Sequence, residues 1–301
     1  MEHKTSNFPT RILERKFFPE ALLELSNPPE RLYVRGELPK FDRSWIAMVG
    51  TRRPSPYAED ICRKLVQRLR GTDAVVVSGL AQGIDSFCHT SAIAEGIPTV
   101  AVIAQGLDVP LEGSRSALAK KILESGGAIL TEYPAKIPPA KFTFPARNRI
   151  IAGLCKSTTL VESKVSGGGM HTVRHAQKLG RPVLCVPGNI LFETSQGPNR
   201  EISQKKAYPV WDFESFPELC GARRLSDPTS SEIFETGIDL GKDAQRLFLE
   251  NAGFTHSVEA LCAHSGLSVS RLLAILTELE IAGLVRSRDG SEFHFLNSEK
   301  P

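Results

Sequence analysis

Continuous apolar runs alternate with amphipathic stretches through the middle of the chain. The apolar runs lie at 45–49, 74–78, 99–103, 128–131, 158–162 and 182–186. Most of them are unbroken rather than alternating, which predicts strands buried on both faces of a parallel sheet. The amphipathic stretches 57–71, 85–96 and 114–127 each end at or next to glycine and predict helices. This strand–helix–strand order predicts a doubly wound α/β sheet.

A second pattern follows near the end of the chain. Residues 243–253, 257–266 and 268–283 predict three short helices, and 283–297 predict a hairpin that turns at Asp289 and Gly290. Ser257 and Ser268 are expected to cap the second and third helices. Three helices and a hairpin predict a small winged-helix domain. The expected organisation is a lead-in segment at 1–43, the α/β domain at 44–216, an acidic linker at 217–241 and the winged helix at 242–297.

The net charge of +3 is unevenly distributed along the chain. Residues 44–211 carry 21 Lys and Arg against 12 Asp and Glu, a net charge of +9. Residues 212–239 carry −5, and residues 240–301 carry −2. A basic domain between nearly neutral and acidic segments indicates a polyanionic ligand. An ordinary solvated basic surface would give the same count.

Several classes of protein are disfavoured by what the sequence lacks. It has no run of about 18 apolar residues and no signal-peptide pattern, so a cytoplasmic protein without membrane association is expected. Its six cysteines are scattered, which predicts neither disulfides nor a zinc site. No dinucleotide fingerprint or P-loop motif is present, so no cofactor is expected. His171 and His175 lie four residues apart but lack an evident third ligand, so no metal is expected.

Glycine-rich loops follow three of the predicted strands, at 50–54, 78–85 and 163–169. Ligands of open α/β sheets bind outside the carboxyl ends of the strands. Glycine allows close approach of the backbone to a phosphate, and N–H groups at a helix start bind anions. We therefore expect the three loops to meet at one edge of the sheet and to hold phosphate groups.

A cluster of polar residues precedes the fifth predicted strand. Pro145 is expected to begin a short helix, with Arg147, Asn148 and Arg149 close together near its start. Two guanidinium groups around an amide suit phosphate and base contacts better than carboxylate chemistry. Ion pairs with neighbouring Asp or Glu are the alternative interpretation for both arginines.

Four segments in this order resemble the DNA processing protein A (DprA/Smf) family. They are GTRRPSPYA, SGLAQGIDSFCH, FPARNRIIAGL and VES…SGGGMHTVRHAQKLGRPVLCVPG, and LSVSRLLAILTELEIAGLVR is similar to the winged helix of many members. The resemblance implies an extended Rossmann-like, mostly parallel sheet and a non-catalytic protein. It further implies a homodimer that binds single-stranded DNA without reading its sequence. Such a protein protects incoming DNA and helps to load the RecA recombinase in natural transformation and DNA recombination.

The resemblance also implies a set of DNA contacts when the family's motifs are carried over by position. These are Gly50, Thr51, Arg52, Ser78, Gly79, Gly83, Arg147, Asn148, Arg149, Lys164, Ser166, Gly167 and Gly168. The third loop departs from the family pattern of a basic residue followed by Ser-Gly, because Ser166, Gly167 and Gly168 stand there. Lys164 is expected to supply the missing cation.

Two other functions remain open on the sequence alone. Residues 166–172 loosely match the PGG-x-G-T loop of nucleotide phosphoribohydrolases, and Glu162 would then be the catalytic acid. A transcription regulator acting through the winged helix is the third hypothesis. The third C-terminal helix carries Arg271 against Glu278 and Glu280, which is a poor electrostatic match for duplex DNA. We therefore expect the winged helix to bind protein or its own sheet domain.

Overall fold

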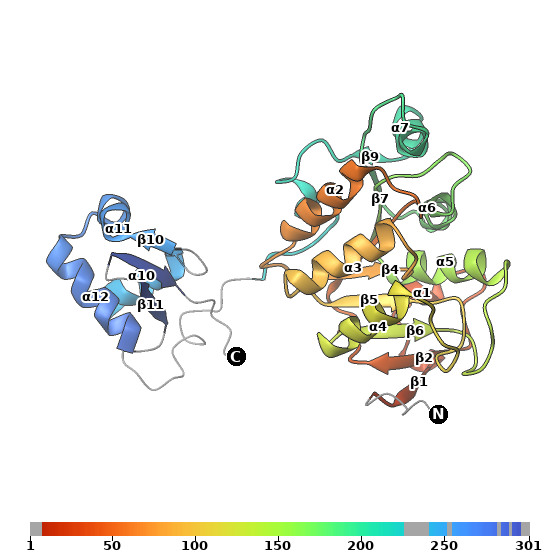
Figure 1. Ribbon diagram of the computed structural model, residues 1–301, viewed down its shortest axis with the longest axis horizontal. Helices are drawn as coiled ribbons and strands as arrows, with labels where there is room; N and C mark the ends of the chain where they lie inside the picture. Colours follow the sequence, from red (N-terminus) through yellow and green to blue (C-terminus); the bar gives the residue numbers. More distant parts are fainter. Residues whose placement is uncertain (1–7, 226–240, 252–254, 282–283, 289–290, 296–301) are drawn as a thin grey trace. The chain divides into compact units, whose positions relative to one another are not determined.

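The computed structural model describes residues 8–225, 241–251, 255–281, 284–288 and 291–295. The chain divides into two compact units, residues 1–224 and 225–301. The first is a large α/β unit, and the second is a small unit of helices and a three-stranded sheet (Figure 1). Each is described by itself below.

A nine-stranded sheet forms the centre of the first unit, with strand order β1-β2-β6-β5-β4-β3-β7-β8-β9. The central strands are β3 (Ser44–Val49), β4 (Ala74–Ser78), β5 (Thr99–Val102), β6 (Ala128–Thr131), β7 (Ser157–Leu160) and β8 (Val183–Cys185). All neighbours from β6 to β9 (Tyr208–Pro209) are parallel. The doubly wound sheet is confirmed, and each of the six strands predicted from sequence is present within two residues of its expected bounds.

Two further strands come from the expected lead-in segment. β1 (Thr10–Glu14) pairs antiparallel with β2 (Arg31–Gly36), which pairs antiparallel with β6. These two strands were not predicted from the sequence, because a search for continuous apolar runs finds only strands that are buried on both faces. β2 alternates buried and more exposed positions, and β1 is almost wholly exposed. They extend the parallel core with an antiparallel edge.

Helices cover both faces of the sheet (Figure 1). α2 (Pro56–Gln67), α3 (Ile84–Ala94) and α4 (Ser114–Glu124) cover one face. α5 (Thr143–Leu154) and α6 (Gly169–Lys178) cover the other, together with α1 (Glu20–Leu23). Side chains of β3 alternate between these layers, since Ile46 and Met48 join one apolar core while Ala47 and Val49 join the other. Hence both faces of each central strand are buried.

The remaining short elements are 3-10 helices η1 (Arg15–Phe17) and η2 (Glu193–Ser195), and α7 (Gln196–Ser203) and α8 (Phe216–Leu219). The predicted start of α5 was wrong. α5 begins at Thr143 rather than at Pro145, and it runs for 12 residues rather than as a short helix. The carbonyl of Ala140 accepts the N–H and the hydroxyl of Thr143, and this turn starts the helix earlier.

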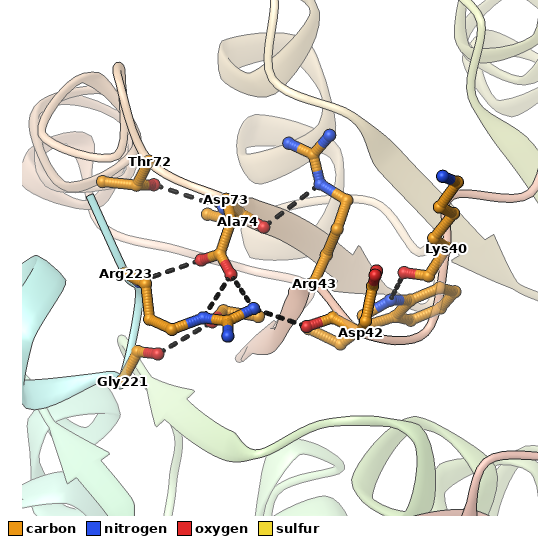
Figure 2. Close-up of polar contacts among 10 residues, drawn as sticks. Lys40, Asp42, Arg43, Thr72, Asp73, Ala74, Gly221 and Arg223 are labelled. Atoms are coloured by element: carbon orange, nitrogen blue, oxygen red, sulfur yellow. Dashed lines mark hydrogen bonds and ion pairs between the residues drawn. The ribbon is translucent and has the colours of Figure 1, made fainter. Parts of the chain in front are cut away.

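The chain after α8 is fastened to the amino-terminal ends of β3 and β4 (Figure 2). The Asp73 carboxylate accepts hydrogen bonds from the backbone N–H of Arg223 at 2.9 Å and from its Nε at 2.7 Å. Nη2 of Arg223 also donates to the Asp42 carbonyl at 2.6 Å. This Asp73–Arg223 clasp lies at the edge of the sheet opposite the carboxyl ends of the strands.

Residues 217–224 therefore lie in the first unit, although their polarity had placed them in the expected linker. The physical reason is that Phe216 and Cys220 are buried in the core beneath α2 and α3. Two buried residues in an otherwise polar segment produce no hydrophobic periodicity, so nothing in the sequence indicated that this segment is packed. The remainder of the expected linker, 226–240, lies outside the described residues.

The second unit is a winged helix. Its helices are α10 (Lys242–Asn251), α11 (Val258–Ser265) and α12 (Val269–Ile281), and its strands are β10 (Thr255–Ser257), β11 (Val285–Arg288) and β12 (Glu292–Phe295). β11 and β12 pair antiparallel, as the predicted hairpin requires, while its turn residues Asp289 and Gly290 lie outside the described residues. Ser257 caps α11 as predicted, since its hydroxyl accepts the Ala260 N–H at 3.2 Å. The Ser268 hydroxyl accepts the N–H of Arg271 at 3.4 Å at the start of α12.

Candidate nucleic-acid interface

A cleft of about 620 Å³ opens at the carboxyl ends of β3 and β7. The strand order reverses between these two strands, and such a switch point is where doubly wound sheets bind ligands. All three glycine-rich loops contribute to its walls, together with the start of α5. We call it the cationic cleft, because its lining holds one carboxylate, Asp85, and five cations: Arg52, Arg53, Lys141, Arg147 and Lys164.

The loop after β3 forms one wall of the cationic cleft. Gly50 is required there, because an added Cβ would lie 2.5 Å from Ile84. The next residue, Thr51, is held by a hydrogen bond of 2.7 Å from its N–H to the Glu162 carbonyl. The exposed guanidinium of Arg52 lies over the Phe144 ring, 5.1 Å from its centroid. This cation–π contact positions Arg52 over the cleft.

The loop after β4 is a scaffold rather than a contact surface. The hydroxyl of Ser78 is buried and donates to the Met48 carbonyl at 2.6 Å. The N–H groups of Gly79 and Ala81 donate to Oδ2 of Asp85, at 3.2 and 3.3 Å. The anion site expected at the start of α3 is therefore occupied by the protein's own carboxylate. Burial raises the pKa of Asp85, and the nearby guanidinium of Arg147 opposes that rise.

Gly83 has a different structural role in the same loop. Its φ of +82° lies in the left-handed region that favours glycine. An added Cβ would also lie 2.5 Å from the Thr51 carbonyl. Gly83 thus allows the loops after β3 and β4 to pack closely, and like Ser78 and Gly79 it lies outside the lining of the cleft.

Arg147 lies at the floor of the cationic cleft and is only 5% exposed. Its Nη1 donates to the Gly79 carbonyl at 2.7 Å and also to the Val102 carbonyl. Burial lowers the pKa of Arg147 to about 10, while the Asp85 carboxylate opposes the shift. Arg147 thus ties the carboxyl ends of β4 and β5 together, and little of it reaches the solvent.

Arg147 and Asn148 contact each other, since Nε of Arg147 donates to Oδ1 of Asn148 at 3.1 Å. Arg149 lies on another side of α5, because successive helical residues are about 100° apart. Arg149 forms an ion pair of 2.5 Å with Glu132, and its side chain is 14% exposed. Burial raises the pKa of Glu132 despite this cation. Asn148 lines the cleft beside Arg147, and its Nδ2 donates to the Gly168 carbonyl at 3.4 Å. The structure therefore brings Arg147 and Asn148 together at the cleft, while Arg149 pairs with Glu132 instead.

The third loop meets the cleft at the start of α6. Lys164 lines the cleft and forms an ion pair with Glu193. Gly168 also lines it, beside the helix start, whose N–H groups and dipole favour an anion. Ser166 is exposed but lies outside the lining, as does Gly167, where an added Cβ would lie 2.3 Å from the Ser163 hydroxyl.

Among the lining residues that the predicted contact set omitted are Arg53, Lys141, Phe144, His171 and Thr172. Arg53 was visible as the neighbour of Arg52. Lys141 and Phe144 flank the true start of α5, so a correct helix boundary would have placed them at the cleft. The other two follow from the start of α6 at Gly169.

All six cysteines are free, and no group of three His, Cys, Asp or Glu side chains in the described ranges is placed to hold a metal. Among those ranges, no helix combines the length and apolarity needed to span a bilayer. In the second unit, the α12 cation Arg271 forms an ion pair of 3.0 Å with Asp243, which reduces its availability for phosphate.

Comparison with known proteins gave concordant matches. Residues 10–220 match the sequence model of the DNA recombination-mediator protein A family, and residues 239–291 match that of the DprA winged helix domain. The chain is 32% identical over 279 residues to Protein Smf of Escherichia coli, covering 92% of this chain and 75% of that protein. It is 37% identical over 190 residues to DNA processing protein DprA of Streptococcus pneumoniae, covering 63% and 67%.

Two solved structures are similar to the chain. The X-ray structure of DNA processing protein A from Streptococcus pneumoniae matches with a TM-score of 0.64 and 35% identity, over 70% of this chain and 74% of that one. The protein of the same name from Helicobacter pylori, described for its unique single-stranded DNA binding mode, also matches with a TM-score of 0.64. It is 29% identical over 70% of this chain and 95% of its own.

Proposed function

Because the chain belongs to the DNA recombination-mediator protein A family, we propose that it acts in DNA recombination by holding single-stranded DNA in the cationic cleft. The observation that carries this proposal is the convergence of five Lys and Arg residues with one carboxylate at the switch point of the sheet. The start of α6, where Gly168 and Gly169 line the cleft, adds the favourable dipole and N–H groups of a helix N-terminus. The solved relative described for its single-stranded DNA binding supports the same ligand.

Phosphate binding falls to the exposed members of the cleft. Arg52, Arg53, Lys141 and Lys164 are exposed, whereas Arg147 is buried by its carbonyl partners. Lys164 would exchange Glu193 for a phosphate group, since both are anions on the surface. Contacts of this kind carry no sequence information, so the protein should bind strands of different sequence with similar affinity.

Membership of the family supports a more specific proposal about the protein's role. We propose that a homodimer in the cytoplasm protects incoming single strands during natural transformation and delivers them to the RecA recombinase. The protein has no catalytic step in this proposal. Glu162, the acid required by the phosphoribohydrolase alternative, is only 4% exposed. Both of its carboxylate oxygens accept hydrogen bonds from Ser55, so it is poorly placed to protonate a substrate. Incubation with AMP should release no base.

A salt series tests the central proposal. The affinity of the full chain for an oligothymidine strand is measured by fluorescence anisotropy between about 50 and 200 mM salt. Each phosphate contact to a single strand contributes about −0.7 to the slope of log affinity against log salt, so four exposed cations predict roughly −3. The Arg52→Ala variant should weaken binding and make this slope shallower by about 0.7.

Arg70→Ala is the matched control. It removes the same charge from a partly exposed side chain that pairs with Glu95, beyond the carboxyl end of α2 and away from the cleft. Both affinity and slope should match the unmodified protein. If the two variants behave alike, or if the chain prefers duplex DNA, the cationic cleft is not the binding site. Nucleation of RecA on the same strand, with and without the protein, tests the delivery step.

A further inference from the structure

A second cavity, of about 480 Å³, lies beside the cationic cleft and was not anticipated from the sequence. Two aromatic side chains line it: Tyr57 at the start of α2 and Phe192 in the segment after β8. They are 51% and 53% exposed, so each ring presents a large free surface. Pro187 and Asn189 complete part of the wall. We call it the aromatic cavity.

Two loops contribute to the lining of both the aromatic cavity and the cationic cleft, either directly or through a residue paired with that lining. In the first, Arg53 lines the cleft and Tyr57 lines the cavity, so their Cα atoms are at most about 14 Å apart. In the second, Lys164 lines the cleft and pairs with Glu193, the neighbour of Phe192. A strand with the 3.4 Å spacing of stacked nucleotides would cross the first distance in about four nucleotides.

The connection between the loops is rigid. The N–H of Ser55 donates to Glu162 at 2.9 Å, and its hydroxyl donates to the same carboxylate at 2.5 Å. The N–H of Ser163 donates to the Thr194 carbonyl at 2.6 Å. These bonds fix the cavity against the end of β7, where the cleft begins.

The two neighbouring hollows differ in chemistry. The described lining of the aromatic cavity contains no Lys or Arg, and its single charged group is the Glu162 carboxylate. A phosphate would therefore be repelled there, while it would be attracted in the cleft. A neutral planar ring is favoured instead, because aromatic side chains stack on any nucleobase.

We propose that the aromatic cavity receives a nucleobase of the strand whose phosphates lie in the cationic cleft. This inference rests on the proposed function. The cationic cleft would then bind the phosphates of the strand, and the aromatic cavity would bind one of its bases. Tyr57 and Phe192 supply the stacking surfaces. The site accepts any base, because every base presents a π-face.

The test uses the full chain and two strands of equal length and charge, oligothymidine and the same backbone without bases. The unmodified protein should bind the strand with bases about tenfold more tightly, the effect of one stacked base. Tyr57→Leu and Phe192→Leu should each bring this ratio towards one, with an unchanged salt slope. The fluorescence of a 2-aminopurine in the strand should be quenched by the unmodified protein and recover in both variants.

Two further variants separate the possible results. Phe17→Leu replaces an exposed aromatic residue of η1 and should leave the ratio unchanged. Arg52→Ala should weaken both strands equally. Equal binding of the two strands by the unmodified protein, or a ratio that survives both cavity variants, overturns the inference and leaves the proposed function standing. Failure to bind either strand overturns the proposed function itself.

Discussion

Arg147 offers the sharpest test of the structure, because sequence similarity and burial assign it different roles. Arg147→Met keeps a long side chain but removes every donor. The carbonyls of Gly79 and Val102 then lose their guanidinium partner, and the Asp85 carboxylate loses the cation that opposes the rise of its pKa. The pKa of Arg147 is about 10, so at neutral pH the folded protein carries this charge.

The expected loss of stability can be built from these contacts. A hydrogen bond from a charged donor contributes about 1.5–3 kcal/mol. The guanidinium makes two such bonds to buried carbonyls, so we expect a loss of about 3–5 kcal/mol in total. Against a typical stability of about 5–15 kcal/mol, that is a large fraction.

Urea denaturation followed by tryptophan fluorescence measures this loss directly. Both tryptophans, Trp45 and Trp211, belong to the first unit, so the signal reports that unit alone. Adding Asp85→Asn to Arg147→Met should restore about 1 kcal/mol or more, because the unpaired buried charge is then removed. Arg52→Ala, which alters an exposed cation, should leave stability unchanged.

The same variants distinguish a structural arginine from a DNA contact. If Arg147→Met kept its stability and only made the salt slope shallower by about 0.7, Arg147 would be a phosphate ligand and the structural assignment would be wrong. A stability loss with the slope retained would support it.

Two further predictions concern the first unit. Gly79→Ala should destabilise it by roughly 1–3 kcal/mol in the same urea assay, because the new Cβ would lie 2.5 Å from the Arg147 guanidinium. Gly168→Ala, which meets nothing within 4 Å, is its control and should be neutral. Burial alone would raise the pKa of Asp73, but hydrogen bonds from Arg223 and Ser44 and the charge of Arg223 outweigh it and lower that pKa. A carboxyl group whose pKa is lower in the folded than in the unfolded protein stabilises the fold at neutral pH. This contribution should disappear as the pH falls below about 4, the ordinary pKa of an aspartate, and Asp73→Asn should then lose less stability than the unmodified protein.

The central sheet could be predicted from the sequence because strands that are buried on both faces are continuous apolar runs. Most of the six apolar runs are unbroken, which is typical of interior strands. Three strands have no such apolar run. β1 is exposed, β2 alternates buried and more exposed residues, and β9 has only two residues. Their place in the sheet is decided by tertiary pairing with strands far away in the chain.

The candidate site was harder to predict, because contact with a ligand and support of a loop use the same residue types. Helical spacing did hold a usable signal for Arg147, which shares a face with the buried residues Ile150, Ile151 and Leu154. This signal could be used only if the helix was known to begin at Thr143. The pairing of Arg149 with Glu132 left no such signal, since the partner lies on the preceding loop.

The two edges of the nine-stranded sheet bear on how copies of the chain can associate. At one edge, β1 places Arg11 and Glu14 on an exposed strand, and Arg11 donates to the Gly36 carbonyl at 2.7 Å. At the other, β9 consists of two residues, and Pro209 has no N–H to donate. Charged or very short edges are poor templates for strand addition. Open-ended assembly of copies by adding strands to this sheet is therefore disfavoured.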